Sequence, residues 1–308
     1  GLGDVYKRQG MARWDKDTGP TIPEWFFEAI ETEYSTHTVE VDECDVVYQK
    51  WGDSGKPGLL LIHGMFAHSH WWDFIAPAFM EEYTVAAMNL TGMGDSDYRY
   101  EYSSTTFAQE IVAVCDDAGF GNDVIVVAHS FGGAMAVKAA NLFPERFGGL
   151  ILVDSGIRNP DDPPPEHLTM MMGGQAKIYP DKRTAIGRFR LQPPQPCENQ
   201  YVMEYIARHS VMPVDGGGWS WKYDEDLSGT MKGGEREPDE YQNLKVPFGL
   251  IYGADSDLFS RSTLDYMRTL IPQDFPAVAV ESAQHHVFLD QPLAFIEHLQ
   301  KMLNDLKS

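Results

Sequence analysis

One stretch of the chain, Asp123–Gly133, constrains the fold more than any other. It reads DVIVVAHSFGG: the apolar run Val124–Ala128 ends abruptly at His129 and Ser130, and two glycines follow. A run of β-branched residues bounded by such a turn predicts a strand that is buried on both faces. From Ala134 onward, small and apolar residues recur about one turn apart, which predicts a helix. This order of strand, turn and helix places Ser130 at the carboxyl edge of a sheet.

The surroundings of Ser130 are typical of a nucleophile elbow, the sharp strand-to-helix turn that exposes a serine hydroxyl. Such a turn needs small residues two positions before and two positions after the serine. Ala128 and Gly132 occupy these positions, so alanine stands where glycine is more common. The alternative interpretation is a serine that only caps the helix. The rest of the chain must decide between the two.

Length and charge limit the classes of protein to consider. The 308 residues are 43% hydrophobic, enough for one large α/β domain with an insertion or for two domains. There are 46 acidic and 24 basic residues, a net charge of −22, which repels nucleic-acid backbones and anionic lipid. We therefore expect neither nucleic acid nor a membrane as partner. No apolar run approaches the length of a membrane span.

The cysteines and the N-terminus suggest where the protein works and how its gene was obtained. Cys44, Cys115 and Cys197 are too widely spaced for a metal site, so we expect reduced thiols and a cytoplasmic location. The segment Asp4–Gln9 looks like the translated end of a transposon used to prepare sequencing libraries. Residues 1–10 are therefore expected to be a non-native leader on a metagenomic sequence, with natural translation starting at Met11.

Strand and helix patterns alternate along two parts of the chain, 11–155 and 241–308. Such alternation predicts an α/β core with a mostly parallel sheet covered by helices on both faces. The alternation breaks between 156 and 240, where two proline-rich segments occur, and this stretch is expected to be an inserted, mostly helical cap domain. The expected strands are 37–41, 45–51, 59–62, 83–90, 124–128, 149–154, 246–252 and 277–281, and the main expected helices are 72–80, 104–118, 262–270 and 292–306.

A serine nucleophile needs a base to take its proton. His285 and His286 follow the last expected strand and precede Asp290-Gln291-Pro292, where a helix is expected to begin. We choose His285 because the first residue beyond a strand end can reach back over the sheet. His286 is expected to have a packing or supporting role.

The base needs an acid to orient it, and the residues alone leave the choice open. Asp255 and Asp257 follow the penultimate strand, although both could belong to a solvated loop. Asp154, at the end of the strand before the cap, is a second candidate, expected rather to anchor the cap junction.

The oxyanion of a tetrahedral intermediate needs two backbone N–H donors. Phe131, next to the nucleophile, is expected to supply one of them. The other is expected from the loop after His63-Gly64, with Met65 as our choice and Phe66 as the alternative.

Taken together, these motifs resemble the α/β-hydrolase superfamily over about 37–155 and 244–306. The resemblance implies the α/β-hydrolase fold, with a helical cap, and the catalytic residues Ser130, Asp257 and His285 in the family's chain order. It is this resemblance that favours Asp257, the last residue of Gly253-Ala254-Asp255-Ser256-Asp257. Two departures from the family pattern, Asn89 and Gln284, lie near the site and are expected to tune it. The resemblance rests on His63-Gly64, Gly92-Met93-Gly94-Asp95-Ser96, Ala128–Gly133, Gly253–Asp257 and His285 with Asp290-Gln291-Pro292.

The resemblance also implies a reaction class. A serine at the elbow disfavours epoxide hydrolases and haloalkane dehalogenases, which use an aspartate. The expected activity is hydrolysis of short-to-medium, apolar carboxylic esters through an acyl-enzyme on Ser130, by a monomer or homodimer with no metal or organic cofactor. A lactone or a phthalate-type half-ester is an alternative substrate. A receptor-like hydrolase fold that only binds its ligand is an alternative from another class.

The cap carries more bulky apolar residues than a solvent-facing insertion needs. About half are expected to pack within the cap and the others to line an apolar pocket over Ser130. The expected pocket residues are Met65, Phe66, Trp71, His129, Phe131, Trp219 and Trp221. The cap arginines are expected to pair with acidic residues across the cap hinge, although one could recognise a substrate carboxylate. The other bulky cap residues are Met170, Met171, Met172, Phe189, Leu191, Met203, Tyr205 and Met212, and the arginines are Arg158, Arg188, Arg190 and Arg208.

Overall fold

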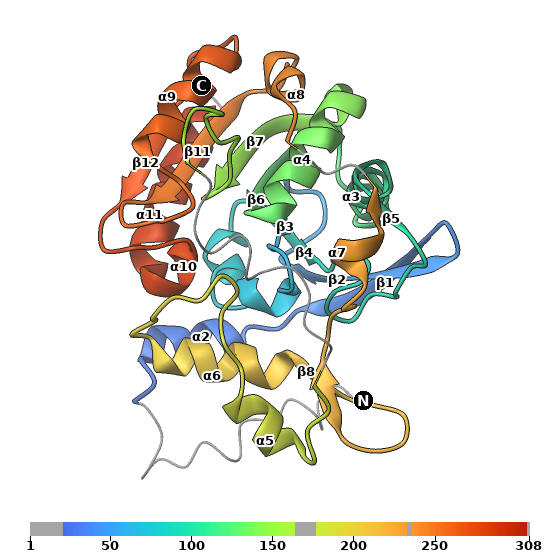
Figure 1. The fold of residues 1–308 in the computed structure, drawn as a ribbon. Helices are drawn as coiled ribbons and strands as arrows, with labels where there is room; N and C mark the ends of the chain where they lie inside the picture. Colours follow the sequence, from blue (N-terminus) through green and yellow to red (C-terminus); the bar gives the residue numbers. More distant parts are fainter. Residues whose placement is uncertain (1–20, 164–176, 233–235, 307–308) are drawn as a thin grey trace.

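A computed structural model describes residues 21–163, 177–232 and 236–306. The expected leader and the three consecutive methionines of the cap lie outside these ranges. Within them, an eight-stranded sheet forms the centre of the molecule (Figure 1). Its strand order is β1-β2-β4-β3-β6-β7-β11-β12. The bounds are β1 Ser35–Val41, β2 Cys44–Trp51, β3 Gly58–Ile62, β4 Thr84–Met88, β6 Val124–His129, β7 Phe147–Val153, β11 Phe248–Gly253 and β12 Ala277–Val280.

The sheet is mostly parallel, as the alternation of strands and helices predicted. β2 pairs antiparallel with β1 and with β4, whereas the six strands from β4 to β12 pair in parallel. The fold is therefore the α/β-hydrolase fold, which the sequence predicted. Because parallel strands end at the same edge, the loops after β3, β6, β7 and β12 meet there.

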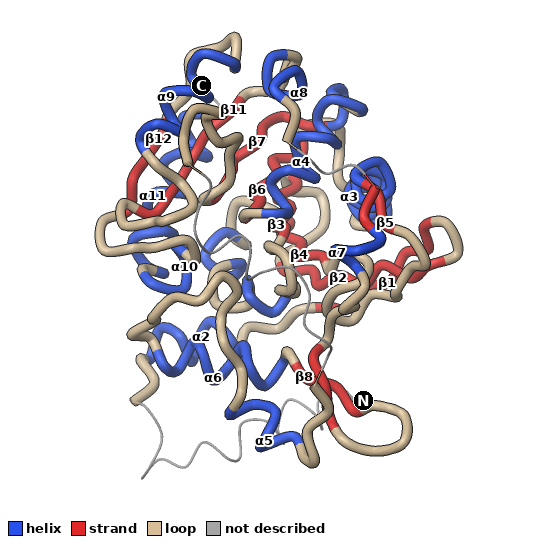
Figure 2. The backbone as a smooth tube through the Cα atoms, in the orientation of Figure 1, coloured by secondary structure: helices blue, strands red, loops and turns tan. Residues whose placement is uncertain are grey.

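Helices cover both faces of the sheet, and each face has its own hydrophobic cluster (Figure 2). Side chains alternate along β3, with Leu60 and Ile62 in one cluster and Leu59 and Leu61 in the other. α3, α4 and α9 pack on the first face, and α2, α10 and α11 on the second. Their bounds are α2 Glu24–Glu31, α3 Ser104–Asp117, α4 Phe131–Leu142, α9 Arg261–Leu270, α10 Val287–Asp290 and α11 Pro292–Leu306.

The expected helix at 72–80 was wrong. Two short 3-10 helices, η1 Ser69–Trp72 and η2 Ala76–Phe79, take its place. Pro77 lacks an N–H group and would clash with a carbonyl one turn earlier, so a continuous α-helix is disfavoured here. A third 3-10 helix, η3 Pro144–Arg146, precedes β7.

The insertion between β7 and β11 contains more than helices. β8 and β9 form an antiparallel pair that the sequence did not indicate, and β10 pairs in parallel with β5, Tyr102–Ser103. The division into core and cap domains stays a prediction. The elements of the insertion are α5 Lys182–Gly187, α6 Gln200–His209, β8 Val211–Pro213, β9 Trp219–Trp221, α7 Leu227–Thr230, β10 Met231–Lys232 and α8 Pro238–Gln242.

α6 packs against α2 from the N-terminal part of the chain (Figure 1). The ring of Phe26 lies 4.9 Å from that of Tyr201 and 5.8 Å from that of Tyr205. Residues of α6 therefore join the same hydrophobic cluster as α10 and α11. At the other end of the insertion, Lys138 of α4 pairs with Glu240 of α8 at 3.0 Å.

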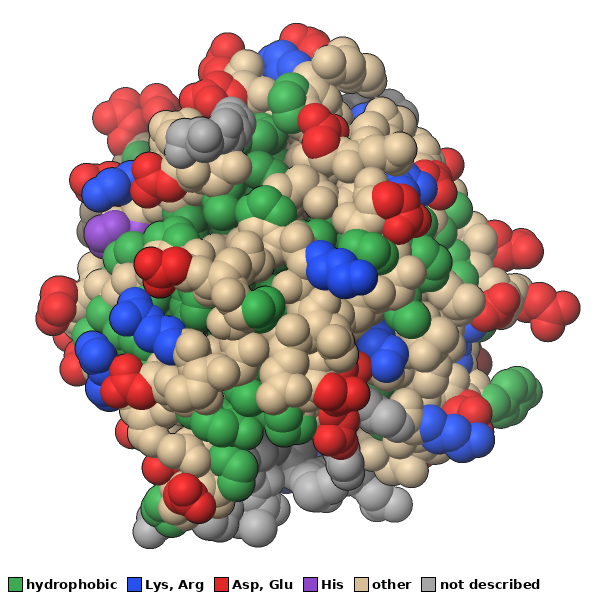
Figure 3. Space-filling view, turned by 90° about the horizontal axis from the view of Figure 1, so that it is seen from above, with side chains coloured by type: hydrophobic (Ala, Val, Ile, Leu, Met, Phe, Trp, Pro, Cys, Tyr) green, Lys and Arg blue, Asp and Glu red, His purple; other side chains and the backbone are tan. Residues whose placement is uncertain are grey.

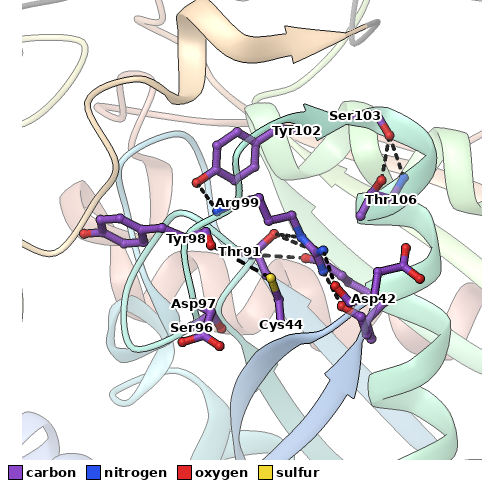
Figure 4. Close-up of polar contacts among 12 residues, drawn as sticks. Asp42, Cys44, Thr91, Ser96, Asp97, Tyr98, Arg99, Tyr102, Ser103 and Thr106 are labelled. Atoms are coloured by element: carbon purple, nitrogen blue, oxygen red, sulfur yellow. Dashed lines mark hydrogen bonds and ion pairs between the residues drawn. The ribbon is translucent and has the colours of Figure 1, made fainter.

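A buried ion pair fixes the loop that follows β4 (Figure 4). Arg99 Nε lies 3.1 Å from Glu110 Oε1 and donates to Thr91 Oγ1 at 2.9 Å. The backbone N–H of Thr91 donates to the other Glu110 oxygen at 3.1 Å, and Arg99 Nη2 donates to the carbonyl of Val41 at 2.7 Å. Burial raises the pKa of Glu110, and the contacts with Thr91 and Arg99 oppose this shift. We call Thr91, Arg99 and Glu110 the Arg99 network.

Acidic side chains are spread over the face seen in Figure 3, as the net charge of −22 requires. Within the described ranges, no helix is both long and apolar enough to cross a membrane.

Candidate active site

Ser130 lies in a strained turn between β6 and α4. Its φ is 52°, a conformation that residues other than glycine rarely adopt and that is found at functional sites. The packing around the turn explains the glycines that follow. A Cβ at Gly132 would lie 2.3 Å from the carbonyl oxygen of His63, and one at Gly133 would lie 2.3 Å from Ser155 Oγ. The turn predicted from the sequence is therefore present and closely packed.

The histidine chosen from the sequence reaches the serine. His285 Nε2 lies 2.9 Å from Ser130 Oγ, and His285 Nδ1 lies 2.7 Å from Asp154 Oδ1. A carboxylate only accepts hydrogen bonds, so His285 Nδ1 carries the proton. The lone pair of Nε2 then faces the serine hydroxyl, the arrangement that a general base requires. His285 and Asp154 are both buried.

The acid partner of His285 is Asp154 and not Asp257, which corrects the interpretation drawn from the resemblance. Asp257 is exposed, as is Asp255. The loop that was expected to supply the acid supplies hydrogen-bond donors instead. The N–H of Gly253 donates to Asp154 Oδ2 at 2.8 Å, and Ser256 Oγ donates to Asp154 Oδ1 at 2.7 Å.

The sequence contained a signal for Asp154 that the family pattern outweighed. Asp154 follows β7, which lies between β6 and β11 in the sheet. A residue at this position is at the same sheet edge as Ser130 and the loop after β11. Which of the two acids contacts His285, Asp154 after β7 or Asp257 after β11, depends on the direction of their side chains. The spacing of residues along the chain does not predict that direction.

Two further histidines surround His285. His129 Nε2 lies 3.0 Å from the carbonyl oxygen of His285, and His286 Nε2 lies 3.4 Å from that of Pro193. The ring of His286 also packs edge-on against Trp71, as its expected supporting role suggested. Burial lowers the pKa of both His129 and His286 well below the ordinary value, so both imidazoles stay neutral.

His63 holds together the loops after β3 and β4. Its Nδ1 lies 2.7 Å from the carbonyl oxygen of Gly64, and its Nε2 accepts a hydrogen bond from the N–H of Leu90 at 3.1 Å. Burial lowers the pKa of His63 to about 4. A Cβ at Gly64 would lie 2.9 Å from His129 Nδ1, so this position needs glycine.

The loop after β3 also bears on the oxyanion donors. The N–H of Phe66, the alternative oxyanion donor, donates to Met93 Sδ at 3.2 Å and therefore already has an acceptor. In the described part of the chain, the N–H groups of Met65 and Phe131 have no protein acceptor. Met65 and Phe131 therefore stay the predicted oxyanion donors.

A small pocket opens onto Ser130. Met65, Trp71 and His129 line it, as predicted from the sequence. Ala67 and Gln192 line it too, and the sequence missed them because neither residue type suggests a binding site. The described lining residues are Gly64, Met65, Ala67, Trp71, His129, Ser130, Gln192, His285 and His286.

Four of the expected pocket residues lie elsewhere. The ring of Phe66 packs at 4.6 Å from that of Tyr223, and the ring of Phe131 packs at 5.6 Å from that of Phe107.

Trp219 and Trp221 belong to β9 and pack within the insertion. Lys182 lies over the ring of Trp219, and the ring of Trp221 lies 5.5 Å from that of Tyr179. The number of bulky residues in the sequence could not reveal these contacts, because the pairing of β9 with β8 was not expected.

In the described part of the chain, three of the four cap arginines have contacts within the insertion, and their expected pairing across the hinge stays a prediction. Arg158 and Arg190 donate to nearby backbone carbonyls, and Arg208 pairs with Glu204 of its own helix. Arg188 is exposed. An arginine that the sequence did not single out, Arg236, donates to the carbonyl of Ser130 at 3.1 Å.

Comparison with known proteins identifies the family of this chain. A profile described as "Alpha/beta hydrolase family" matches residues 59–298. The protein belongs to the α/β-hydrolase family. The match includes the strands that carry Ser130, Asp154 and His285.

Several relatives of this α/β hydrolase are named as ester hydrolases, at low identity. Esterase Rv0045c of Mycobacterium tuberculosis is 24% identical over 267 residues, 83% of this chain and 85% of the esterase. Lipase LipV of the same organism is 34% identical over 113 residues, so the match spans only 42% of the lipase.

Solved structures share the fold of this α/β hydrolase. The thioesterase domain from the curacin biosynthetic pathway superposes with a TM-score of 0.71 at 23% identity, covering 87% of this chain and all of that domain. The crystal structure of Esterase Rv0045c gives a TM-score of 0.68 at 22% identity, covering 92% of this chain and 99% of the esterase.

The two departures from the family pattern have clear structural contacts. Asn89 Oδ1 accepts from the N–H of Ser69 at 2.8 Å, and its Nδ2 donates to the carbonyl of Val47 at 3.1 Å. The N–H of Gln284 donates to Asp290 Oδ2 at 2.8 Å. Burial raises the pKa of Asp290 to about 6. Tuning of the site by Asn89 and Gln284 stays a prediction.

Proposed function

We propose that this protein hydrolyses carboxylic esters through an acyl-enzyme on Ser130. The observation that carries the proposal is the continuous hydrogen-bonded line from Ser130 Oγ through His285 to Asp154, at 2.9 and 2.7 Å. Ester-hydrolase relatives at low identity support the same reaction class.

The first half of the reaction forms the acyl-enzyme. His285 Nε2 takes the hydroxyl proton while Ser130 Oγ attacks the ester carbonyl carbon. The oxyanion that forms is stabilised by the N–H groups of Met65 and Phe131. As the carbon–oxygen bond to the alcohol breaks, His285 returns the proton to the leaving alcohol oxygen.

The second half reverses these roles with water. His285 takes a proton from water, whose oxygen attacks the acyl carbon, and Ser130 leaves with the proton from His285. Asp154 accepts a hydrogen bond from the Nδ1–H group throughout, so it keeps the ring in the right tautomer and stabilises the imidazolium that forms twice per cycle.

The pocket supports a small, apolar acyl or alcohol group. Met65, Ala67 and Trp71 supply apolar surface, and the pocket is small. Its nine described lining residues include no arginine or lysine, so nothing among them would pair with a substrate carboxylate. This favours an uncharged ester over a phthalate-type half-ester.

The test compares catalytic efficiency on p-nitrophenyl butyrate, p-nitrophenyl palmitate and a phthalate half-ester. We expect the butyrate ester to be hydrolysed best. A preference for palmitate would contradict the small pocket, and a preference for the half-ester would assign an arginine to it. Absence of turnover on all three, and on simple lactones, would favour the ligand-binding alternative.

A further inference from the structure

The three histidines around the nucleophile, His129, His285 and His286, form a cluster with unusual hydrogen bonding. One ring nitrogen of each lies within 4.8 Å of a ring nitrogen of the other two. His129 Nδ1 and His286 Nδ1 are fully buried and have no hydrogen-bond partner in the described part of the chain. Because buried polar atoms are nearly always paired, two orphaned nitrogens in one pocket point to a ligand.

The other nitrogen of each ring fixes the tautomer. His129 Nε2 faces the carbonyl oxygen of His285, and His286 Nε2 faces that of Pro193. His285 Nδ1 faces the carboxylate of Asp154. All three partners only accept hydrogen bonds, so each of these nitrogens carries the proton. His129 Nδ1, His285 Nε2 and His286 Nδ1 are therefore left with lone pairs.

This is the arrangement that histidine ligands of metals show. A ligating histidine almost always donates its second N–H to a carboxylate or a backbone carbonyl, which orients the ring and raises its basicity. Here the carboxylate is that of Asp154, and the carbonyls belong to His285 and Pro193. Three neutral imidazoles suit Zn²⁺ and similar divalent transition metals, and no proton need leave when such an ion binds.

We propose that His129 Nδ1, His285 Nε2 and His286 Nδ1 form a binding site for a divalent transition-metal ion, with Zn²⁺ as the best-fitting ion, and that its occupation inhibits the enzyme. The ion would take the lone pair of His285 Nε2, which the reaction needs as a base. Ser130 Oγ or water would complete a tetrahedral shell.

The geometry requires only small movements. A tetrahedral Zn²⁺ with bonds of about 2.0–2.1 Å places its ligand nitrogens roughly 3.3–3.4 Å apart. One ring nitrogen of each histidine already lies within 4.8 Å of a ring nitrogen of the other two, and all three residues line the pocket that opens onto Ser130. Modest ring rotations therefore bring them together.

The test measures binding directly, so that it does not depend on the ester-hydrolase proposal. Zn²⁺ is added to the full-length protein in competition with a chromophoric chelator, and the visible absorption of bound Co²⁺ reports the ligand geometry. We expect one tight equivalent in the wild type and a tetrahedral Co²⁺ spectrum. The variant S130A removes the nucleophile and keeps the three histidines, so it should bind Zn²⁺ as tightly as the wild type does.

Two variants identify the site. H129Q and H286Q should each weaken Zn²⁺ binding at least tenfold, whereas the matched control H298Q, on α11 away from the pocket, should bind as the wild type does. Circular dichroism checks that each variant is folded. If one of the two does not fold, the other together with the Co²⁺ spectrum decides the question.

Two results would overturn the proposal. One is a wild type that binds no Zn²⁺, because water would then satisfy the two orphaned nitrogens. The other is binding that H129Q and H286Q leave unchanged, because the ion would then be held elsewhere. Where the wild type hydrolyses esters, Zn²⁺ should inhibit and a chelator should restore the rate. A tight ion without inhibition would contradict only the second half of the proposal.

Discussion

Two buried polar clusters of this protein differ in how completely they are paired. In the Arg99 network, the guanidinium, the carboxylate and the hydroxyl all have partners at hydrogen-bond distance. Around Ser130, by contrast, His129 Nδ1 and His286 Nδ1 are buried without a partner among the described residues.

The difference distinguishes buried polar groups that stabilise the structure from buried polar groups that bind a ligand or take part in a reaction. In a fully paired cluster every polar group already has a hydrogen-bond partner, so the cluster holds the backbone in place and leaves no group free for a ligand. The Arg99 network holds the loop after β4 and the end of β1 in this way (Figure 4). A cluster with open lone pairs costs free energy, so a protein keeps it where substrate or another ligand uses those groups. The strained φ of Ser130 belongs to the same pattern.

The largest effect is expected at the nucleophile. Ser130→Ala should lower kcat by about 10⁶, because it removes the nucleophile. The free energy of unfolding should change by only about 1 kcal/mol, because the substitution gives up the hydrogen bond between Ser130 Oγ and His285 Nε2. Steady-state kinetics on p-nitrophenyl butyrate and urea unfolding measure the two quantities. A variant that keeps more than roughly a hundredth of the wild-type rate would show that Ser130 is not the nucleophile.

The next effect distinguishes the two acids. Asp154→Asn should lower kcat by about 10⁴, because an amide at this position favours the wrong tautomer of His285. Asp257→Asn is the matched control and should leave kcat/KM unchanged, since Asp257 is exposed. The reverse order would restore the assignment that the family resemblance favoured.

In the Arg99 network, the expected effect is on stability. Glu110→Ala leaves the buried guanidinium of Arg99 without its carboxylate and should reduce the free energy of unfolding by roughly 3–5 kcal/mol. Glu101→Ala breaks the exposed pair with Lys232 and should cost about 0–1 kcal/mol. Urea unfolding gives both values, and kcat per folded molecule should not change in either variant. An equal loss of free energy of unfolding in the two variants would mean that the buried Arg99–Glu110 pair contributes no more to stability than the exposed Lys232–Glu101 pair.

A further effect is a dependence of stability on pH. Burial lowers the pKa of His63 from 6.5 to about 4. Between these two pH values, His63 is protonated in the unfolded chain and neutral in the folded protein. The contribution of His63 to stability is thus present above about pH 6.5 and lost as the pH falls towards about 4. His68, His129, His209 and His286 act in the same direction.

Urea unfolding at several pH values across this range measures that loss. H298Q should show the same slope as the wild type, because His298 lies on the partly exposed side of α11. A free energy of unfolding that stays constant between about pH 7 and pH 5 would mean that the buried histidines titrate as they do in water.

Local sequence determined most of the fold and two of the three catalytic residues, Ser130 and His285. Alternating strand and helix patterns predicted the sheet because burial on both faces requires continuous apolar runs, as in β3 and β6. Ser130 could be predicted because the elbow needs small neighbours at fixed offsets, and His285 because it lies in the loop that follows the last strand. These signals are local, so neighbouring residues in the chain carry them.

Only the tertiary structure decided which acid faces His285, which aromatic residues line the pocket and which ring nitrogens stay unpaired. Asp154 and Asp257 both follow strands that end at the same sheet edge. The donors from Gly253 and Ser256, about 100 residues further along the chain, hold the Asp154 carboxylate beside His285. Trp219 and Trp221 were misplaced for the same reason: the pairing of β8 with β9 sets their direction. Side-chain direction depends on contacts between distant segments, and these contacts exist only once the chain has folded.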